Sequence, residues 1–231
     1  MVRFFALPLA LACALLLTHP AQAQVPPTAA ETAAYQGLHA AAARGDLPAL
    51  NKLVAARADL NARDAQGRTP LHVATFARQA EAIRALAQAG ADVNLRENHL
   101  YDALTIAAVA DDEATLRVLL QLGASARQMT SRYEGTALIA AAHLGHNGVV
   151  RQLIAAGAPL DHVNNLHWTA LIESIVLGDG GPRHQATLKA LLDAGASHAL
   201  TDRQGNTPLH LARQRGFSEM VQMLQAAGAK G

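Results

Sequence analysis

Residues 64–74 have the sequence DAQGRTPLHVA, and residues 202–212 repeat it near the C-terminus as DRQGNTPLHLA. Each copy predicts a tight turn that leads into a helix. Gly67 tolerates the positive φ that such a turn requires. Thr69 can cap the free N–H groups of the first helical turn, and Pro70 takes the first helical position, where a missing N–H costs nothing. The second copy has Gly205, Thr207 and Pro208 at the equivalent positions, so both copies specify one turn–helix start.

The rest of the chain repeats with a period of 33 residues. Leu38, Leu71 and Leu104 are spaced by 33, and so are Thr136 and Thr169. Such self-similarity is typical of a repeat array, in which neighbouring units stack to build one continuous core. With one inserted residue in the fourth unit and five in the fifth, the register gives six units, roughly 31–63, 64–96, 97–130, 131–163, 164–201 and 202–231.

A period of 33 residues with a TPLH helix start resembles the ankyrin-repeat family, over nearly the whole chain after its N-terminal segment. The resemblance implies an all-α repeat solenoid of about six units including modified end caps, each a helix–turn–helix with a β-turn finger. In the second unit the pattern predicts helices over 69–77 and 80–88. Ile83 and Leu86 have core spacing there, and Gly90 ends the second helix.

The first 23 residues are typical of a secretory signal peptide. Arg3 supplies the basic start, residues 4–17 form the apolar run, and Ala21-Gln22-Ala23 is a small-x-small cleavage site. Two alternatives stay open: an uncleaved anchor, for which the apolar run is short, and lipidation at Cys13, whose context only partly resembles a lipobox. We expect a periplasmic or secreted bacterial protein.

Cleavage would leave a flexible linker over residues 24–31, which contains Pro26-Pro27, and an ankyrin-repeat domain over 32–231. It would remove Arg3 from the 19 Lys and Arg, leaving 18 basic residues against 18 acidic ones. A balanced chain has no broad electrostatic reason to bind nucleic acid or an anionic membrane. We expect a protein partner, no nucleic acid, no membrane after cleavage, and a monomer.

Three units depart from the regular pattern. The third replaces Thr-Pro with Asp102-Ala103, and Asp102 can still cap the helix. The fourth has a longer finger over residues 129–135, which predicts a longer or differently bent turn. The fifth has a Gly- and Pro-rich segment over 178–185, which predicts a loop between its two helices.

The histidines raise the alternative of a metal protein or an enzyme. The resemblance implies that those at the TPLH position are structural, bonding to turn backbone and the capping Thr: His39, His72 and His210. His162 and His167 flank a turn, but zinc needs three or four convergent ligands. The sequence has no nucleophile elbow, P-loop or dinucleotide fingerprint. We expect no catalysis, no metal site and no cofactor.

The surface of a repeat array favours recognition instead. The resemblance implies that fingers and first helices line a concave face, and Tyr101, Tyr133 and Trp168 all fall on fingers in a chain that is only 3% aromatic. Aromatic residues and Arg dominate interface energetics. The candidate partner-binding residues are Gln66, Arg68, Phe76, His99, Tyr101, Arg132, Tyr133, His143, His167 and Trp168. The alternative for Tyr101 and Trp168 is packing between neighbouring fingers.

The functional hypothesis is therefore a secreted or periplasmic interaction module without catalysis, which presents a rigid concave surface to a protein partner. The resemblance implies a role in supporting or protecting another envelope protein. Two alternatives are an immunity protein that neutralises a toxin and a secreted host-directed effector. A histidine-based metal protein or enzyme is the competing class.

Overall fold

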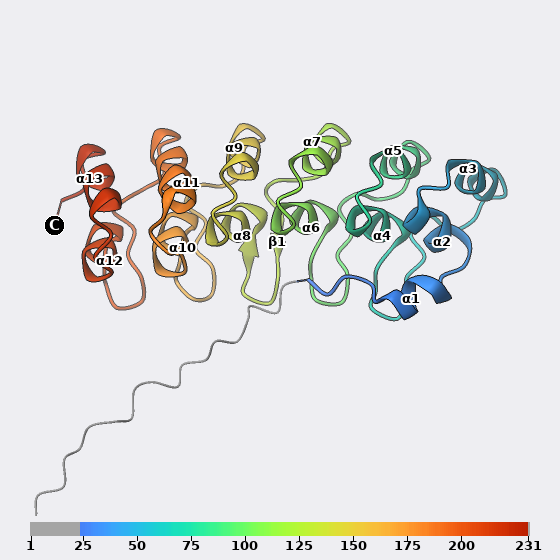
Figure 1. Cartoon of the computed structure of the whole chain (residues 1–231), viewed down its shortest axis with the longest axis horizontal. Helices are drawn as coiled ribbons and strands as arrows, with labels where there is room; N and C mark the ends of the chain where they lie inside the picture. The colour runs from blue at the N-terminus through green and yellow to red at the C-terminus, as the bar shows by residue number, and fades with distance from the viewer. Residues whose placement is uncertain (1–23, 231) are drawn as a thin grey trace, which may run out of the picture.

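The computed structural model describes residues 24–230, so the predicted signal peptide over 1–23 lies outside the described residues. Figure 1 shows a row of helix pairs that runs from one end of the molecule to the other, with the connecting fingers along one side. Twelve of the helices form six pairs, which confirms the predicted solenoid of six units. The first helices of successive units pack side by side along the whole row.

The elements are short. They are α1 (Ala29–Ala34), α2 (Gly37–Arg44), α3 (Leu47–Ala55), α4 (Pro70–Phe76), α5 (Ala80–Gln88), α6 (Ala103–Val109), α7 (Glu113–Gln121), β1 (Met129–Thr130), β2 (Gly135–Thr136), α8 (Ala137–His143), α9 (Asn147–Ala155), α10 (Ala170–Val176), α11 (Pro182–Asp193), α12 (Pro208–Gln214) and α13 (Ser218–Ala226). None of the helices within residues 24–230 is long and apolar enough to cross a membrane.

The turn–helix start has the geometry that its residues predict. Gly67 has φ +75°, and the Thr69 hydroxyl accepts a hydrogen bond from the His72 N–H at the start of α4. Asp102 does the same for α6, where its Oδ1 lies 2.7 Å from the Thr105 nitrogen. Local capping chemistry therefore sets where each first helix begins.

Stacking of these helices makes one elongated core. A leucine stands at the same position of every first helix and is buried in each: Leu38, Leu71, Leu104, Leu138, Leu171 and Leu209. Burying one such side chain contributes about 2 kcal/mol, and the surrounding alanines let the helices approach closely. The core thus grows lengthwise with the number of units.

Three segments differ from expectation. The linker prediction over 24–31 is wrong from Thr28 onward, because Thr28 and Glu31 form a capping box that starts α1. The loop predicted over 178–185 ends at Gly181, where Pro182 takes the first position of α11 and lengthens that helix. The finger of the fourth unit is a two-stranded antiparallel hairpin, β1 with β2, which confirms that this finger is differently bent.

Candidate functional site

Four of the fingers share one pattern of internal hydrogen bonds. A side-chain oxygen at the base of the finger accepts hydrogen bonds from backbone N–H groups two and four residues later, as Asp64 does for Gln66 and Arg68. Glu97, Asn164 and Asp202 repeat it in three other fingers. This bonding closes each turn and holds the finger tips in a regular row.

The middle fingers expose several large apolar side chains. Five large apolar side chains there are 38–52% exposed, and we call them the finger patch: Leu100, Met129, Tyr133, Val163 and Leu166. They lie on the fingers of units three, four and five, which touch in order. The Ser131 N–H donates to the Leu100 carbonyl at 3.3 Å, and the Asn165 N–H donates to the Tyr133 carbonyl at 3.0 Å. The patch therefore extends over three neighbouring fingers.

Backbone conformation singles out the same fingers. The residue two positions before each helix cap has a positive φ in five fingers: Gly67 (75°), Leu100 (71°), Glu134 (55°), His167 (64°) and Gly205 (80°). The two regular units use glycine there, and the middle units use side chains that disfavour this conformation. A non-glycine residue in the left-handed region costs about 1 kcal/mol. This register was visible in the sequence and would have marked Leu100.

Some of the predicted finger residues are exposed, and others are half-buried. Arg132, Tyr133 and His167 are exposed on the adjacent fingers of units four and five. Tyr101 and Trp168 are half-buried, and Trp168 packs against the core. Burial also raises the pKa of the Tyr101 hydroxyl. These two aromatics are thus partly covered and still present part of their surface.

The predicted residues of the first fingers are less available. Gln66 is half-buried, and its backbone carbonyl accepts from the Asn98 N–H at 3.0 Å. The half-buried His99 ring bonds within its own finger, with Nδ1 3.0 Å from the Glu97 carboxylate. Neither the Gln66 backbone nor the His99 ring nitrogen Nδ1 is free for a partner.

Arg68 corrects the sequence-based assignment, because its side chain is 1% exposed. Its Nε lies 2.6 Å from Asp64 Oδ2 and its Nη2 lies 2.6 Å from Glu31 Oε1. These contacts hold the segment that contains α1. Phe76 is half-buried beneath the same segment, which passes over it with Pro26 and Pro27. Arg68 is therefore an internal anchor in this structure.

His143 lies beside a buried carboxylate that sequence reasoning missed. Glu173 on α10 is 6% exposed, and its Oε2 lies 3.6 Å from His143 Nδ1. Its Oε1 accepts a hydrogen bond from Asn164 Nδ2 at 2.8 Å. Burial raises the pKa of Glu173 to about 7, against the opposing effect of the Asn164 hydrogen bond. Asn164 also closes the fifth finger, so Glu173 is bonded directly to the base of the finger that presents Trp168.

The TPLH histidines are structural where a neighbouring unit covers them. His39 Nε2 lies 2.9 Å from the Arg68 carbonyl, and His72 Nδ1 lies 2.8 Å from the Thr69 hydroxyl. Burial lowers the pKa of His72 to about 4, so it is neutral near pH 7. His210 differs, because no finger within residues 24–230 covers it. Its ring is exposed and contacts Gln214.

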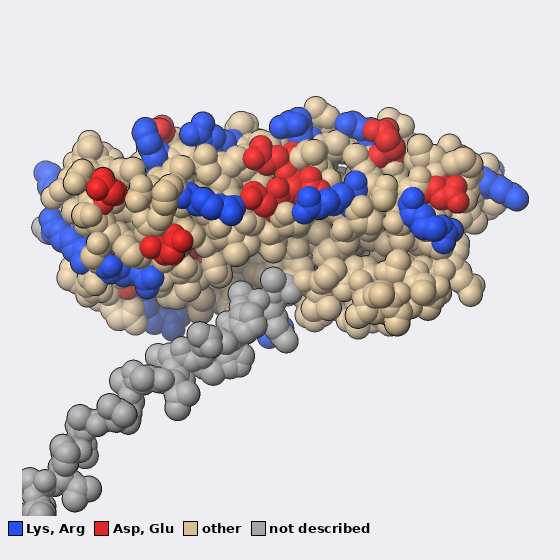
Figure 2. Space-filling model, in the orientation of Figure 1, with Lys and Arg blue, Asp and Glu red and all other residues tan. Residues whose placement is uncertain are grey.

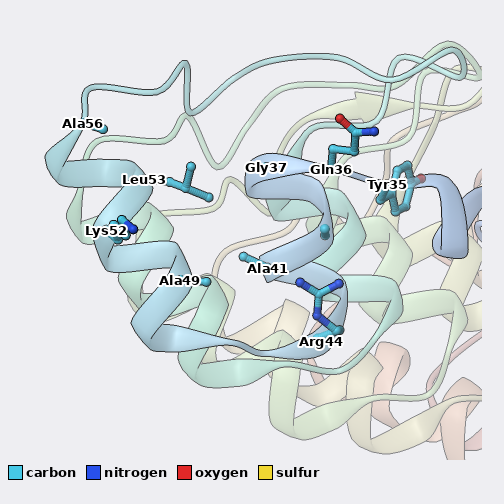
Figure 3. A pocket seen from close by; sticks show the side chains of 10 residues that line it. Tyr35, Gln36, Gly37, Ala41, Arg44, Ala49, Lys52, Leu53 and Ala56 are labelled. Carbon is cyan, nitrogen blue, oxygen red and sulfur yellow. The ribbon is translucent and has the colours of Figure 1, made fainter.

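Neither a metal centre nor an enzyme-like pocket stands out. Within residues 24–230, no three His, Cys, Asp or Glu side chains are grouped so that they could hold a metal ion. His162 Nε2 contacts the Glu134 carbonyl. An open groove of about 480 Å³ lies on the first unit, and Figure 3 shows Arg44, Ala49 and Lys52 in its lining. That lining contains no carboxylate, imidazole or thiol for acid–base or nucleophilic chemistry.

The charged side chains form no single broad field on the face that Figure 2 shows. Acidic and basic residues are interspersed there, with the acidic ones gathered near the middle. Asp111 pairs with Arg183 across units at 2.8 Å, and the exposed Arg78 lies 3.7 Å from Asp112. The Asp111–Arg183 pair is exposed on both sides and stabilises little. This face lacks the continuous basic stripe that a nucleic-acid site requires.

Comparison with known families identifies the same repeats. Residues 38–130 match a model of three copies of the ankyrin repeat, residues 134–165 a single ankyrin repeat, and residues 182–225 a model of many ankyrin repeats. The chain is 47% identical over 100 residues to YahD, an ankyrin repeat protein of Escherichia coli (strain K12). That match covers 43% of this chain and 50% of YahD, so it spans half the relative's length.

Solved structures match over more of the chain. An ankyrin repeat domain from Acinetobacter baumannii AYE is 44% identical, with a TM-score of 0.79, and the match covers 84% of this chain and 98% of that one. A chain in the complex of the predatory endopeptidase Bd0816 of Bdellovibrio bacteriovorus with immunity protein Bd3460 is 25% identical, with a TM-score of 0.70. That match covers 83% of this chain and 98% of that one.

Proposed function

Because the chain belongs to the ankyrin-repeat family, whose repeats are protein–protein interaction modules, we propose that it recognises a protein partner through the finger patch and has no catalysis of its own. We place it in the periplasm or outside the cell, which rests on the signal-peptide pattern of residues 1–23. There it supports or protects another protein of the envelope.

The finger patch is the observation that carries this proposal. Its five apolar side chains lie on three fingers that contact one another, whereas the regular units have Gln66 and Gln204 near their tips. Contiguous exposed apolar surface rimmed by polar residues marks interaction sites. Arg132 and His167 are exposed polar residues on the same fingers. A partner would gain apolar burial at the centre and polar contacts around it.

Backbone strain supports the same site. Leu100 and His167 keep a positive φ at a position where glycine would remove a cost of about 1 kcal/mol. Strain of this kind persists where the side chain has another use. The fingers that accept it are those that display the patch. A rigid, preformed surface also limits the ordering cost of binding.

A second candidate function is immunity toward a secreted hydrolase. It is favoured by the likeness, at a TM-score of 0.70, to a chain in the complex of an endopeptidase with its immunity protein. In that role the finger patch would cover an enzyme of the producing cell. A captured hydrolase whose activity falls when this chain is added would favour immunity over protection.

Affinity capture tests the site. The chain, immobilised, is incubated with periplasmic extract of its own bacterium, and bound proteins are identified by mass spectrometry. We expect Tyr133→Ala combined with Leu166→Ala to abolish capture of a stoichiometric partner, because each removes a large exposed contact. Leu177→Ala is the matched control, since Leu177 is an exposed leucine at the opposite end of its helix. Equal loss with the control, or unchanged capture with the double variant, would refute the finger patch.

A further inference from the structure

The segment before the first repeat turns back onto the array. Residues 24–27 precede α1, and Figure 1 draws them in blue below α6 and α4 on the way to α1 beside α2. This segment is not a repeat unit, because α1 has no helical partner of its own and packs only on α2 among the major contacts. None of the residues of α1 is fully buried. Something other than an apolar core therefore holds it.

Arg68 provides the main anchor. Its Nη2 lies 2.6 Å from Glu31 Oε1, and its Nη1 donates to the Val25 carbonyl at 3.3 Å. Beside it, the Tyr35 hydroxyl donates to Asp64 Oδ2 at 2.6 Å. The Arg68 guanidinium thus donates hydrogen bonds to both a backbone carbonyl and a carboxylate of the segment. Charge-assisted bonds of this geometry are among the stronger polar contacts in proteins.

The apolar contact under the segment is loose. A hollow of about 130 Å³, open to solvent, is lined by Pro26 and Pro27 of the segment and by Val73 and Phe76 of α4. The segment is therefore seated on α4 without the close packing seen between the first helices, and it can leave without opening the core.

We propose that residues 24–35 form a strap that occupies, within one molecule, a second peptide-binding surface made by Arg68 and the outward side of α2 and α4. The ligand class that this surface fits is an extended, proline-containing peptide followed by a carboxylate. Proline pre-organises the extended segment, and Arg68 receives the carboxylate. The surface is separate from the finger patch and does not depend on it.

Tethering keeps the surface closed. The strap is joined directly to α2, so its effective concentration over Arg68 is on the order of millimolar or higher. A peptide in solution competes with the strap only when its concentration exceeds this effective concentration. Release of the strap would expose Arg68 and Phe76, both of which it now covers. A partner with matching chemistry could then bind where the strap lay.

A peptide-binding experiment on the full chain tests the strap. Glu31→Ala removes the carboxylate of the strap and leaves Arg68 intact. The probe is a fluorescein-labelled peptide with the sequence of residues 24–36, followed by fluorescence anisotropy. We expect the Glu31→Ala chain to bind it at least about tenfold more tightly than the unmodified chain, and a peptide with Gln in place of the glutamate to lose about the same factor. Glu219→Ala, on α13, is the control chain and should bind like the unmodified one.

Hydrogen exchange on the same variants makes a negative result decisive. In the Glu31→Ala chain the amides of residues 29–35 should exchange faster, while circular dichroism and the amides of α4 stay unchanged. If these amides are released and the peptide still binds no better, the segment is only an end cap and the proposal is wrong. If they remain protected, Glu31 does not anchor the strap, and the proposal fails at its first step.

Discussion

Glu173→Gln is the substitution whose effect the structure predicts most fully. Glu173 is 6% exposed, its Oε1 accepts from Asn164 at 2.8 Å, and its Oε2 lies 3.6 Å from His143. Glutamine keeps the shape and the acceptor for Asn164 but removes the charge. The variant therefore isolates the cost of an ionised carboxylate at this place.

The magnitude follows from the pKa. Burial raises the pKa of Glu173 from its ordinary 4.5 to about 7, so the folded protein holds a proton that the unfolded chain releases. The contribution of the Glu173 proton to the free energy of unfolding is complete below pH 4.5 and is lost as the pH rises through 7. Each tenfold change in proton affinity is about 1.4 kcal/mol, which makes the total loss about 3 kcal/mol. Glutamine does not titrate, so the variant should match the natural protein near pH 4.5 and exceed its stability by up to about 3 kcal/mol near pH 8.

His72 gives the free energy of unfolding a pH dependence of the opposite sign. Burial lowers the pKa of His72 from 6.5 to about 4, so its contribution is present above pH 6.5 and is lost as the pH falls through 4. This slope is common to both proteins and cancels in their difference. The raw profile of the natural protein should consequently be flatter than either group alone would make it.

Urea unfolding at a series of pH values from about 4.5 to 8 measures the difference. Circular dichroism follows the whole array, and the fluorescence of Trp168 follows the unit that contains Glu173, since Trp168 is the one tryptophan in the chain. Coincident transitions would justify a two-state free energy. Glu219→Gln, an exposed glutamate on α13, is the control. A difference between Glu173→Gln and the natural protein that does not grow with pH would refute the reasoning.

Four further substitutions test the fingers and the base of the fifth one. Leu100→Gly should raise the free energy of unfolding by up to about 1 kcal/mol, because it relieves a positive φ, yet weaken partner capture. Gly67→Ala and Gly205→Ala should each cost about 1 kcal/mol in urea unfolding, with the larger loss at Gly67. There a Cβ would collide with a side chain of the next finger, whereas Gly205 has open space. Asn164→Asp replaces the donor to Glu173 by a second carboxylate. It should destabilise by about 1–3 kcal/mol near pH 8 and less near pH 5, where thermal midpoints should converge.

The repeat frame was predictable because its determinants act locally. Gly67, Thr69 and Pro70 specify a turn, a cap and a helix start within four residues, and the 33-residue period then places every other unit. The helix predicted over 80–88 is α5 itself. The capping box of Thr28 and Glu31 was equally local, but the prolines before it favoured a linker in the prediction.

The candidate site could be predicted only in part, because partner-facing and buried positions share one spacing. Alignment placed Arg68, Tyr101 and Trp168 at the same point of their fingers. In the structure Arg68 is buried and the two aromatics are half-buried. Exposure at a finger depends on what the neighbouring finger or segment places against it, and the repeat period carries no such information.

Sequence alone therefore settles the family, the six units and the starts of the regular first helices, since these depend on backbone preferences and a regular apolar pattern. The roles of individual polar side chains emerge only when the units stack. Arg68 meets Glu31 across 37 positions in the chain, and Glu173 is buried because α8 and the fifth finger close around it. The environment that buries a charge or leaves a leucine exposed comes from distant residues, so the assembled array defines the surfaces this protein can use.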